Sequence, residues 1–402
     1  MTTALINFFK DASNIFKGGP KYYMLMGILG AIVAVGLGAY YLQFDRGLIV
    51  TAMRDQVAWG FYIANFTFLV GVAAAAVLLV IPSYLYKFKP IKEVVLFGEI
   101  MAVTAIIMCL LFIMVDVGRP LFVWHMLPVI GTINFPVSML AWDFFVLNGY
   151  LAVNLAALGY VLYCYSQGRP YSLKVLLPIV ILSIPMAFSI HTVTAFLYGA
   201  AKARPMWNVS ILGPRFLASA FCSGPALMLL VFQALRKYEK VDIEDKAIFK
   251  ISEIITYALG INLFFLFVEI FTDFYSNTLS GVSLHYLFFG IGDKTSLVPF
   301  IWTAVVFNVI AFAIMLTPKY RYNFKTLNVA LVLMIIGVYI EKGMGLVIPG
   351  QTPDTLGEIY EYVPTTPELL ISMALWAFGA MIFIALTKFA LPKIRASKDF
   401  EH

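Results

Sequence analysis

Residues 59–79 read WGFYIANFTFLVGVAAAAVLL and contain no charged side chain. A helix of about 20 apolar residues crosses the roughly 30 Å hydrocarbon core of a bilayer. Backbone polar groups in lipid must be hydrogen-bonded within the segment, and a helix achieves this. The stretch therefore predicts a transmembrane helix.

Similar apolar runs recur along the whole chain. Of the 402 residues, 61% are hydrophobic and 12% are charged, and the mean hydropathy is +0.89. This composition excludes a soluble domain and predicts an all-α polytopic membrane protein. We expect ten spans at about 22–44, 57–86, 93–115, 136–164, 171–198, 214–235, 250–273, 298–317, 326–348 and 366–391.

The basic residues indicate how the spans are oriented. Of the 28 lysines and arginines, 20 lie in or beside the two terminal tails and the loops after the even-numbered spans 2, 4, 6 and 8. Cytoplasmic segments carry such an excess, so we expect a multi-pass protein of the cytoplasmic (inner) membrane with both termini in the cytoplasm. Because the net charge of +6 is spread along one membrane face, a nucleic-acid partner is not expected.

The N-terminal segment 1–21 has no apolar core followed by a cleavage site, so we expect no cleaved signal. Its spaced apolar residues predict a short interfacial helix. The three cysteines, Cys109, Cys164 and Cys222, stand singly in apolar segments. This pattern encodes neither iron–sulfur ligation nor a disulfide framework, and we expect no metal site.

Polar residues gather at the predicted outer ends of the spans. Asp116 and His125 follow span 3, Asp143 lies early in span 4, and His191 lies near the outer end of span 5. Span 7 carries further acids, Glu269 and Asp273, at i and i+4 on one helical face. Ionisable groups in lipid are costly, so such residues mark cavities or partners.

This constellation suits a quinone pocket, which needs hydrogen-bond partners for the carbonyl oxygens and a group that exchanges protons. Histidine beside a carboxylate supplies the exchange. We expect His191, Asp143, Asp116 and Glu269 to carry the chemistry. The quinone-binding candidates are His191, Asn65, Tyr62, His125, Trp124 and Tyr198. For His191 alone, a structural hydrogen bond at a helix end is the alternative.

Other residues have two interpretations each. Glu99, Glu253 and Asp273 are candidate steps of a proton path, whereas Glu99 and Glu253 can equally be interior hydrogen-bonded carboxyls. Asn65 can bond a neighbouring helix or a ligand carbonyl. Arg215, at the start of span 6, is expected to reach the outer interface.

Internal similarity predicts the domain organisation. Spans 2–5 and 6–9 share an acid (Asp116, Asp273), a loop histidine (His125, His285) and a tryptophan early in the third helix (Trp142, Trp302). We therefore expect two parallel four-helix units, at 57–198 and 199–348. The remaining segments are 1–21, a flanking span with its loop at 22–56, and span 10 with the cytoplasmic tail at 349–402.

Two other functions compete with a quinone site. A haem b anchor needs paired inward-facing histidines, and His125, His191 and His285 allow at most one haem at the outer side. An ion or solute transporter is favoured by the repeat and the intramembrane acids, but the polar residues gather at one side rather than at the midplane.

Four features together resemble the NrfD/PsrC family of integral membrane subunits. They are the ten spans, RDQVAWGFYIANFTFLVG at Arg54–Gly71, DVGRP at Asp116–Pro120, and the connection from His191 through Gly213 to Gly224. The HTVTAFLYG at His191–Gly199 is most similar to the DsrP-type subunits associated with dissimilatory sulfite reduction.

The resemblance implies a haem-free protein without a covalently bound cofactor, whose substrate is menaquinone or another quinone. It also implies a ferredoxin-like iron–sulfur subunit docked at the outer side, with a multihaem cytochrome c and further membrane subunits as additional partners. Related branches carry an acid six residues after the span 5 histidine, where this chain has Leu197. A carboxylate for His191 must then come from another helix, with Asp143 or Glu269 as candidates.

Overall fold

The computed structural model describes residues 6, 8–86, 89–92, 94–276, 278 and 280–397. Ten helices in this part are long and apolar enough to cross a membrane. They are α2 (Pro20–Arg46), α3 with α4 and the π-helical turn η3 (Phe61–Ala74, Val77–Val80, Ile81–Leu85), α6 (Val95–Asp116), α7 (Met139–Ser166), α8 (Leu173–Gly199), α9 (Leu212–Tyr238), α10 (Asp245–Ser276), α12 (Val298–Leu316), α14 with the π-helical turn η5, α15 and η6 (Phe324–Tyr339, Ile340–Met344, Gly345–Val347, Pro349–Gln351), and α16 (Thr366–Ser397).

Short helices lie between or before the spans. They are η1 (Lys10–Phe16), η2 (Leu48–Val50), α5 (Lys89–Lys92), η4 (Pro120–Met126), α11 (Ser280–Phe288) and α13 (Pro318–Arg321). The N-terminal segment contains the short helix η1, which packs against α16, and just before it the Phe8 and Phe389 ring centroids lie 5.3 Å apart. Its interfacial position stays a prediction. Residues 1–5 and 7 of that prediction lie outside the described residues.

The all-α prediction and the number of spans are confirmed, and two spans differ in detail. The second span is not one continuous helix, because α3 ends at Ala74 and Pro82 stands in the π-helical turn η3. Proline removes a backbone donor and disrupts the regular ladder. The ninth span likewise changes to the π-helical turn η5 at Ile340.

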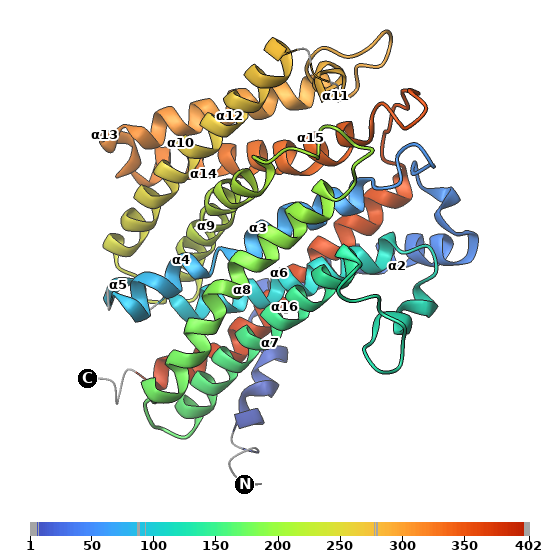
Figure 1. Cartoon of the computed structure of the whole chain (residues 1–402). Coiled ribbons are helices and arrows are strands. Elements are labelled where there is room, and N and C mark those ends of the chain that lie inside the picture. The colour runs from blue at the N-terminus through green and yellow to red at the C-terminus, as the bar shows by residue number, and fades with distance from the viewer. Residues whose placement is uncertain are drawn as a thin grey trace.

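Helix α3 is the centre of the packing. Thirteen of its 14 residues are buried, because it contacts α6, α8, α9 and α16. Figure 1 shows α10, α12 and α14 on one side of α3 and α9, with α6, α7 and α16 on the other. In contrast, α2 lies at the periphery and packs mainly on α16.

The contacts group the helices by position in the chain. Helix α7 packs against α6 and α8, whereas α12 packs against α10 and α14, and α9 contacts both α10 and α14. Trp142 and Trp302 each donate the indole N–H to a carbonyl oxygen of the preceding segment, at 2.8 and 2.9 Å. These features accord with two similar units, whose limits stay a prediction.

The N-terminal end of α3 is held by residues from the other end of the chain. The Gln351 Oε1 accepts from the backbone of Ala58 at 2.8 Å, and Phe61 N–H donates to Tyr362 Oη at 2.8 Å. Tyr362 in turn donates to the buried carboxylate of Glu368. Burial and this carboxylate raise the pKa of Tyr362, so the phenol stays a neutral donor.

Candidate functional site

One face of α8 carries three buried polar side chains. His191, Thr194 and Tyr198 are spaced i, i+3 and i+7, which places them on the same side of the helix. All three are buried. Both ring nitrogens of His191 are buried and have no hydrogen-bond partner among the residues that the structure describes. The imidazole is therefore open to a ligand group that donates or accepts a hydrogen bond.

Asp143 of α7 faces this side of α8. Its Oδ1 accepts a hydrogen bond from the Thr194 hydroxyl at 2.9 Å. Thr194 lies less than one turn from His191, so the carboxylate and the imidazole occupy neighbouring positions on two packed helices. A carboxylate from another helix thus reaches this region.

Aromatic side chains surround Tyr198. Its hydroxyl lies 2.5 Å from that of Thr67 on α3. The Tyr198 ring centroid lies 5.5 Å from that of Trp59, 5.0 Å from that of Trp207 and 5.8 Å from that of Phe216. The Trp59 and Trp207 rings also stack on each other, with centroids 5.6 Å apart, so this end of α8 is a packed aromatic cluster beside polar groups.

Tyr62 and Asp116 lie near this region but have separate partners. The Tyr62 hydroxyl donates to Gln43 Oε1 at 2.6 Å, and Gln43 Nε2 donates to the Val115 carbonyl oxygen at 2.6 Å. Asp116 has one buried carboxylate oxygen without a partner. Tyr62 and Tyr198 both interact electrostatically with Asp116. Asp116 is therefore a polar neighbour of the site.

Asn65 is engaged in helix packing. Its Oδ1 accepts from Tyr339 at 2.9 Å and from the Trp376 indole at 2.8 Å, while Nδ2 donates to the Phe61 carbonyl oxygen at 2.8 Å. The structural interpretation of Asn65 fits these contacts better than a ligand role.

His125 and Trp124 lie apart from the buried cluster. Both are exposed in η4, and their ring centroids are 3.9 Å apart. His285 is also set apart, because its Nδ1 lies 3.1 Å from the Gly290 carbonyl oxygen in its own loop. Of His125, His191 and His285, only His191 is buried.

Glu269 does not act as the carboxylate beside His191 in this structure. It forms an ion pair with Arg215 of α9, and Arg215 also pairs with Glu341 of η5 at 3.1 Å. The expectation that Arg215 reaches the outer interface is wrong. Its side chain is only 11% exposed, because two carboxylates hold it between the helices.

The proton-path candidates occupy three different settings. Glu99 is buried in α6, and its Oε2 has no hydrogen-bond partner. Glu253 is half-buried and pairs with Lys250 at 2.9 Å, so it is not an interior carboxyl. Asp273 accepts hydrogen bonds from Thr278 at 2.8 Å and from Ser280 at 2.6 Å.

An apolar cavity of about 280 Å³ lies between α3, α6, α9 and α16. Its lining includes Leu69, Met108 and Trp376 and holds no acid, base or imidazole. Leu69 lies about 200° around α3 from Thr67, so the cavity and Tyr198 are on opposite sides of that helix. The cavity therefore offers no side chain that could exchange a proton.

Several residues with polar roles were not predicted from the sequence. Thr67 and Thr194 join helices through their hydroxyls, and Glu341, with its neighbour Lys342, carries a buried charge. The pair Glu341–Lys342 gave a usable signal, since it interrupts an otherwise apolar run. The threonines gave none, because threonine is common in membrane helices without a functional role.

Known proteins resemble this chain over nearly its full length. The chain is 25% identical over 408 residues to a putative membrane subunit of a dimethyl sulfoxide reductase from Halobacterium salinarum, covering 93% of this chain and 92% of the relative. It is 25% identical over 395 residues to an Hdr-like menaquinol oxidoreductase integral membrane subunit of Archaeoglobus fulgidus, covering 94% and 96%. A selenate reductase subunit of Mesobacillus selenatarsenatis is 22% identical over 414 residues, covering 92% and 94%.

The family described as "Polysulphide reductase, NrfD" matches residues 49–353. This region includes α3 and α8 together with Asp143, His191 and Glu341, and it makes up most of the chain. The chain belongs to the NrfD family of polysulphide reductase-like membrane proteins.

Proposed function

We propose that this chain is the quinone-reactive membrane subunit of a respiratory oxidoreductase complex. It exchanges electrons between a membrane quinone and an iron–sulfur subunit docked at the outer side. The observation that carries the proposal is the buried imidazole of His191, whose two nitrogens lack partners while Asp143 lies against the neighbouring Thr194. The names of the three relatives, all of them subunits of reductases or oxidoreductases, support it.

The chemistry assigned to His191 is proton transfer at the quinol hydroxyl. A neutral imidazole nitrogen accepts the proton, and the nearby Asp143 carboxylate stabilises the imidazolium that forms. The quinol loses two electrons and two protons and becomes a quinone. The protons leave toward the outer side, and the electrons pass to the iron–sulfur partner. The reverse direction uses the same groups.

The quinone is assigned as menaquinone. The name of the Archaeoglobus fulgidus relative includes menaquinol oxidoreductase, and that relative matches nearly the whole chain. The aromatic side chains of Trp59, Trp207 and Phe216 around Tyr198 offer faces against which a fused-ring headgroup can stack. Extraction of the purified complex followed by mass analysis would identify the quinone that it retains.

Purification of the assembled complex tests the proposal as a whole. The subunits that copurify with the chain should include an iron–sulfur protein, and added menaquinol should reduce its clusters. An optical spectrum of the same sample decides the haem alternative through the presence or absence of a Soret band. The proposal would be contradicted if the chain purified without any redox partner and moved a solute across the membrane of liposomes.

A further inference from the structure

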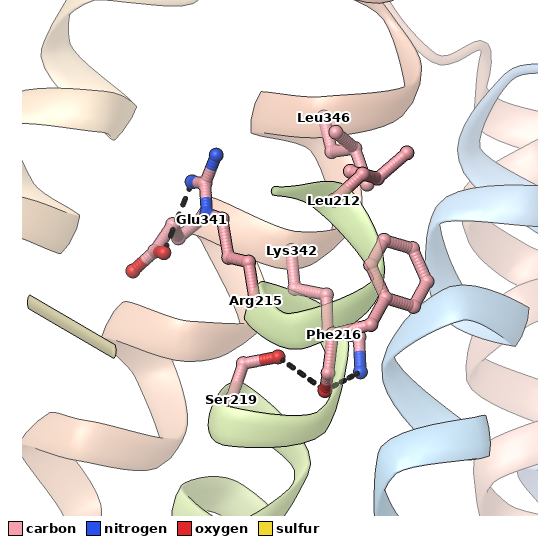
Figure 2. Close-up of a pocket in the computed structure, with 7 residues that line it drawn as sticks. All are labelled: Leu212, Arg215, Phe216, Ser219, Glu341, Lys342 and Leu346. Atoms are coloured by element: carbon pink, nitrogen blue, oxygen red, sulfur yellow. Dashed lines mark hydrogen bonds and ion pairs between the residues drawn. The ribbon is translucent and has the colours of Figure 1, made fainter. Parts of the chain in front are cut away.

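Two internal spaces among the spans differ in what they can hold. The space shown in Figure 2 has a volume of about 10 Å³, close to what one water molecule needs, and its lining includes Arg215, Glu341 and Lys342. The other is the apolar cavity of about 280 Å³ between α3, α6, α9 and α16, and no residue that lines it is charged. The larger space therefore requires an occupant of a different kind.

The polar side chains in the lining of the apolar cavity are already engaged. The Thr104 hydroxyl donates to the Ile100 carbonyl oxygen at 2.9 Å, and the Trp376 indole N–H donates to Asn65 Oδ1 at 2.8 Å. The other lining side chains are those of leucine, valine, isoleucine, alanine, methionine and phenylalanine. An apolar cavity stays dry, and an engineered one of about 150 Å³ binds benzene. The chemistry of the lining thus suits a hydrocarbon.

The cavity lies at the depth of the hydrocarbon core. Met101 is the lining residue nearest to the end of a span, and it stands six residues from Val95 at the start of α6. Six residues of an α-helix extend about 9 Å. Since the core of a bilayer is about 30 Å thick, the medium around the cavity consists of lipid chains rather than water.

The floor and the rim of the cavity come from different helices. All lining residues from α3 and α6, such as Met101 and Met108, are buried and form the floor. Those from α9 and α16, such as Val231 and Ala380, are mostly half-buried and form the rim. Helix α9 packs mainly on α3, α10 and α14, and α16 packs mainly on α2 and α6, rather than on each other. The cavity therefore opens to the bilayer between α9 and α16.

We propose that the apolar cavity binds one hydrocarbon chain of a membrane phospholipid, which enters between α9 and α16 and leaves its headgroup outside the cavity. A quinone whose ring lies at His191 does not suit this place, because the cavity and Tyr198 lie on opposite sides of α3. The cavity also offers no free group that could hold a quinone carbonyl. This inference goes beyond the proposed function and does not rest on it.

Photocrosslinking of the assembled complex in lipid nanodiscs tests the proposal. The probe is a phosphatidylcholine with a diazirine at the middle of one acyl chain. Irradiation releases N₂, and the resulting carbene inserts into a neighbouring bond of the protein. Peptide mapping should find the label on Met101 or Met108, which are only 5% and 4% exposed. Surrounding lipid reaches these two side chains only if a chain enters the cavity.

Other methionines of the same chain serve as internal controls. Met373 on α16 is 55% exposed, so surrounding lipid should label it in every sample. Met315 and Met334 are fully buried and do not line the cavity, so they should stay unlabelled. The proposal is overturned if Met101 and Met108 stay unlabelled as well. It is also overturned if all four buried methionines are labelled equally, because the label would then not report a chain in the cavity.

Substitutions at the rim should close the cavity from either side. Ala380→Leu on α16 and Val231→Phe on α9 each enlarge a lining side chain, so each should abolish the label on the floor methionines while Met373 keeps its own. The matched control is Ala34→Leu, because Ala34 is exposed on the peripheral α2. Two rim variants on different helices guard against a folding defect in one of them. Undiminished labelling of the floor in both rim variants would contradict the proposal.

Competition distinguishes a phospholipid chain from a quinone tail. Excess menaquinone without a diazirine should leave the label on Met108 unchanged. Loss of that label would assign the cavity to a quinone tail and overturn the proposal. His191→Gln should also leave the label unchanged, whether or not quinol turnover survives. The proposed function and the phospholipid site can therefore fail separately.

Discussion

At the scale of single residues, the Thr194 hydroxyl is the link between α7 and the histidine-bearing face of α8. It donates to Asp143 Oδ1 at 2.9 Å and also approaches the Ile190 carbonyl oxygen at 2.7 Å. Without this donor, a buried carboxylate loses its hydrogen bond and its fixed position. The orientation of Asp143 relative to His191 should therefore depend on Thr194, a side chain that cannot itself exchange a proton at neutral pH.

Replacement of Thr194 by valine tests this dependence. Valine keeps the shape of threonine but removes the hydroxyl, and a hydrogen bond to a charged group is worth about 1.5–3 kcal/mol. We expect quinol-dependent reduction of the partner to fall by about tenfold or more, since about 1.4 kcal/mol corresponds to a factor of ten. The matched control is Thr192→Val, because Thr192 is exposed and donates only to its own helix. Equal rates in the two variants would contradict the assigned role.

The sequence predicted part of this site. His191 and Asp143 stood out because ionisable residues are rare in apolar spans. Because this chain has Leu197 where related branches carry an acid, the sequence predicted that a carboxylate near His191 comes from another helix. In the structure, Asp143 of α7 lies against the α8 face. The partner of Glu269 was not predictable, because it depends on Arg215, which comes from a helix whose packing is set by the tertiary fold.

At the scale of the helices, small residues permit the close approach of α3 and α9. A Cβ added at Gly224 would lie 2.4 Å from the Ala75 Cβ and 2.9 Å from the Gly71 carbonyl oxygen. The small residues Gly71 and Ala75 of the second span therefore serve packing, as in other membrane helix pairs. The same contact brings α9, which carries Arg215 and Phe216, beside the central helix.

Gly224→Ala should destabilise the protein through this contact. Overpacking of a close interface typically costs about 1–3 kcal/mol. We expect a lower midpoint of thermal unfolding in detergent. The control is Gly159→Ala on α7, where an added Cβ meets no atom within 4 Å. An unchanged midpoint of thermal unfolding in the Gly224 variant would show that α3 and α9 can move apart without loss of stability.

The π-helical turn η5 was not predicted, because hydropathy reports which residues face lipid and not the pattern of backbone hydrogen bonds. The turn covers Ile340–Met344 and contains both Glu341 and Lys342. Such turns occur often at functional sites. The position of these two charges on one short turn is therefore a result of the fold that apolar periodicity alone does not encode.

At the scale of the whole molecule, the number of spans and the all-helical fold followed from long apolar runs. The orientation in the membrane rests on the distribution of lysine and arginine and stays a prediction. It has a functional consequence, because in the proposed mechanism it decides on which side of the membrane His191 releases protons. It also decides where a partner can dock.

Single cysteines test the orientation. Cys109, Cys164 and Cys222 are buried, so they should not react with a membrane-impermeant maleimide. Val129→Cys, at a fully exposed position in the loop before α7, should be labelled in intact cells or right-side-out vesicles. Lys240→Cys, in the exposed loop between α9 and α10, should be labelled only after permeabilisation. The reverse pattern would place His191 at the cytoplasmic side.

The most direct test of the quinone assignment is the rate at which added quinol reduces the iron–sulfur partner in a complex with His191→Gln. The variant must assemble with the same subunits as the wild type. His285→Gln serves as the matched control, because the His285 ring contacts the Gly290 carbonyl oxygen five residues away in the same connection. We predict that His191→Gln lowers the rate by at least about 100-fold, the usual contribution of a positioned general base. The same rate in the His191 variant, the control and the wild type would contradict the account.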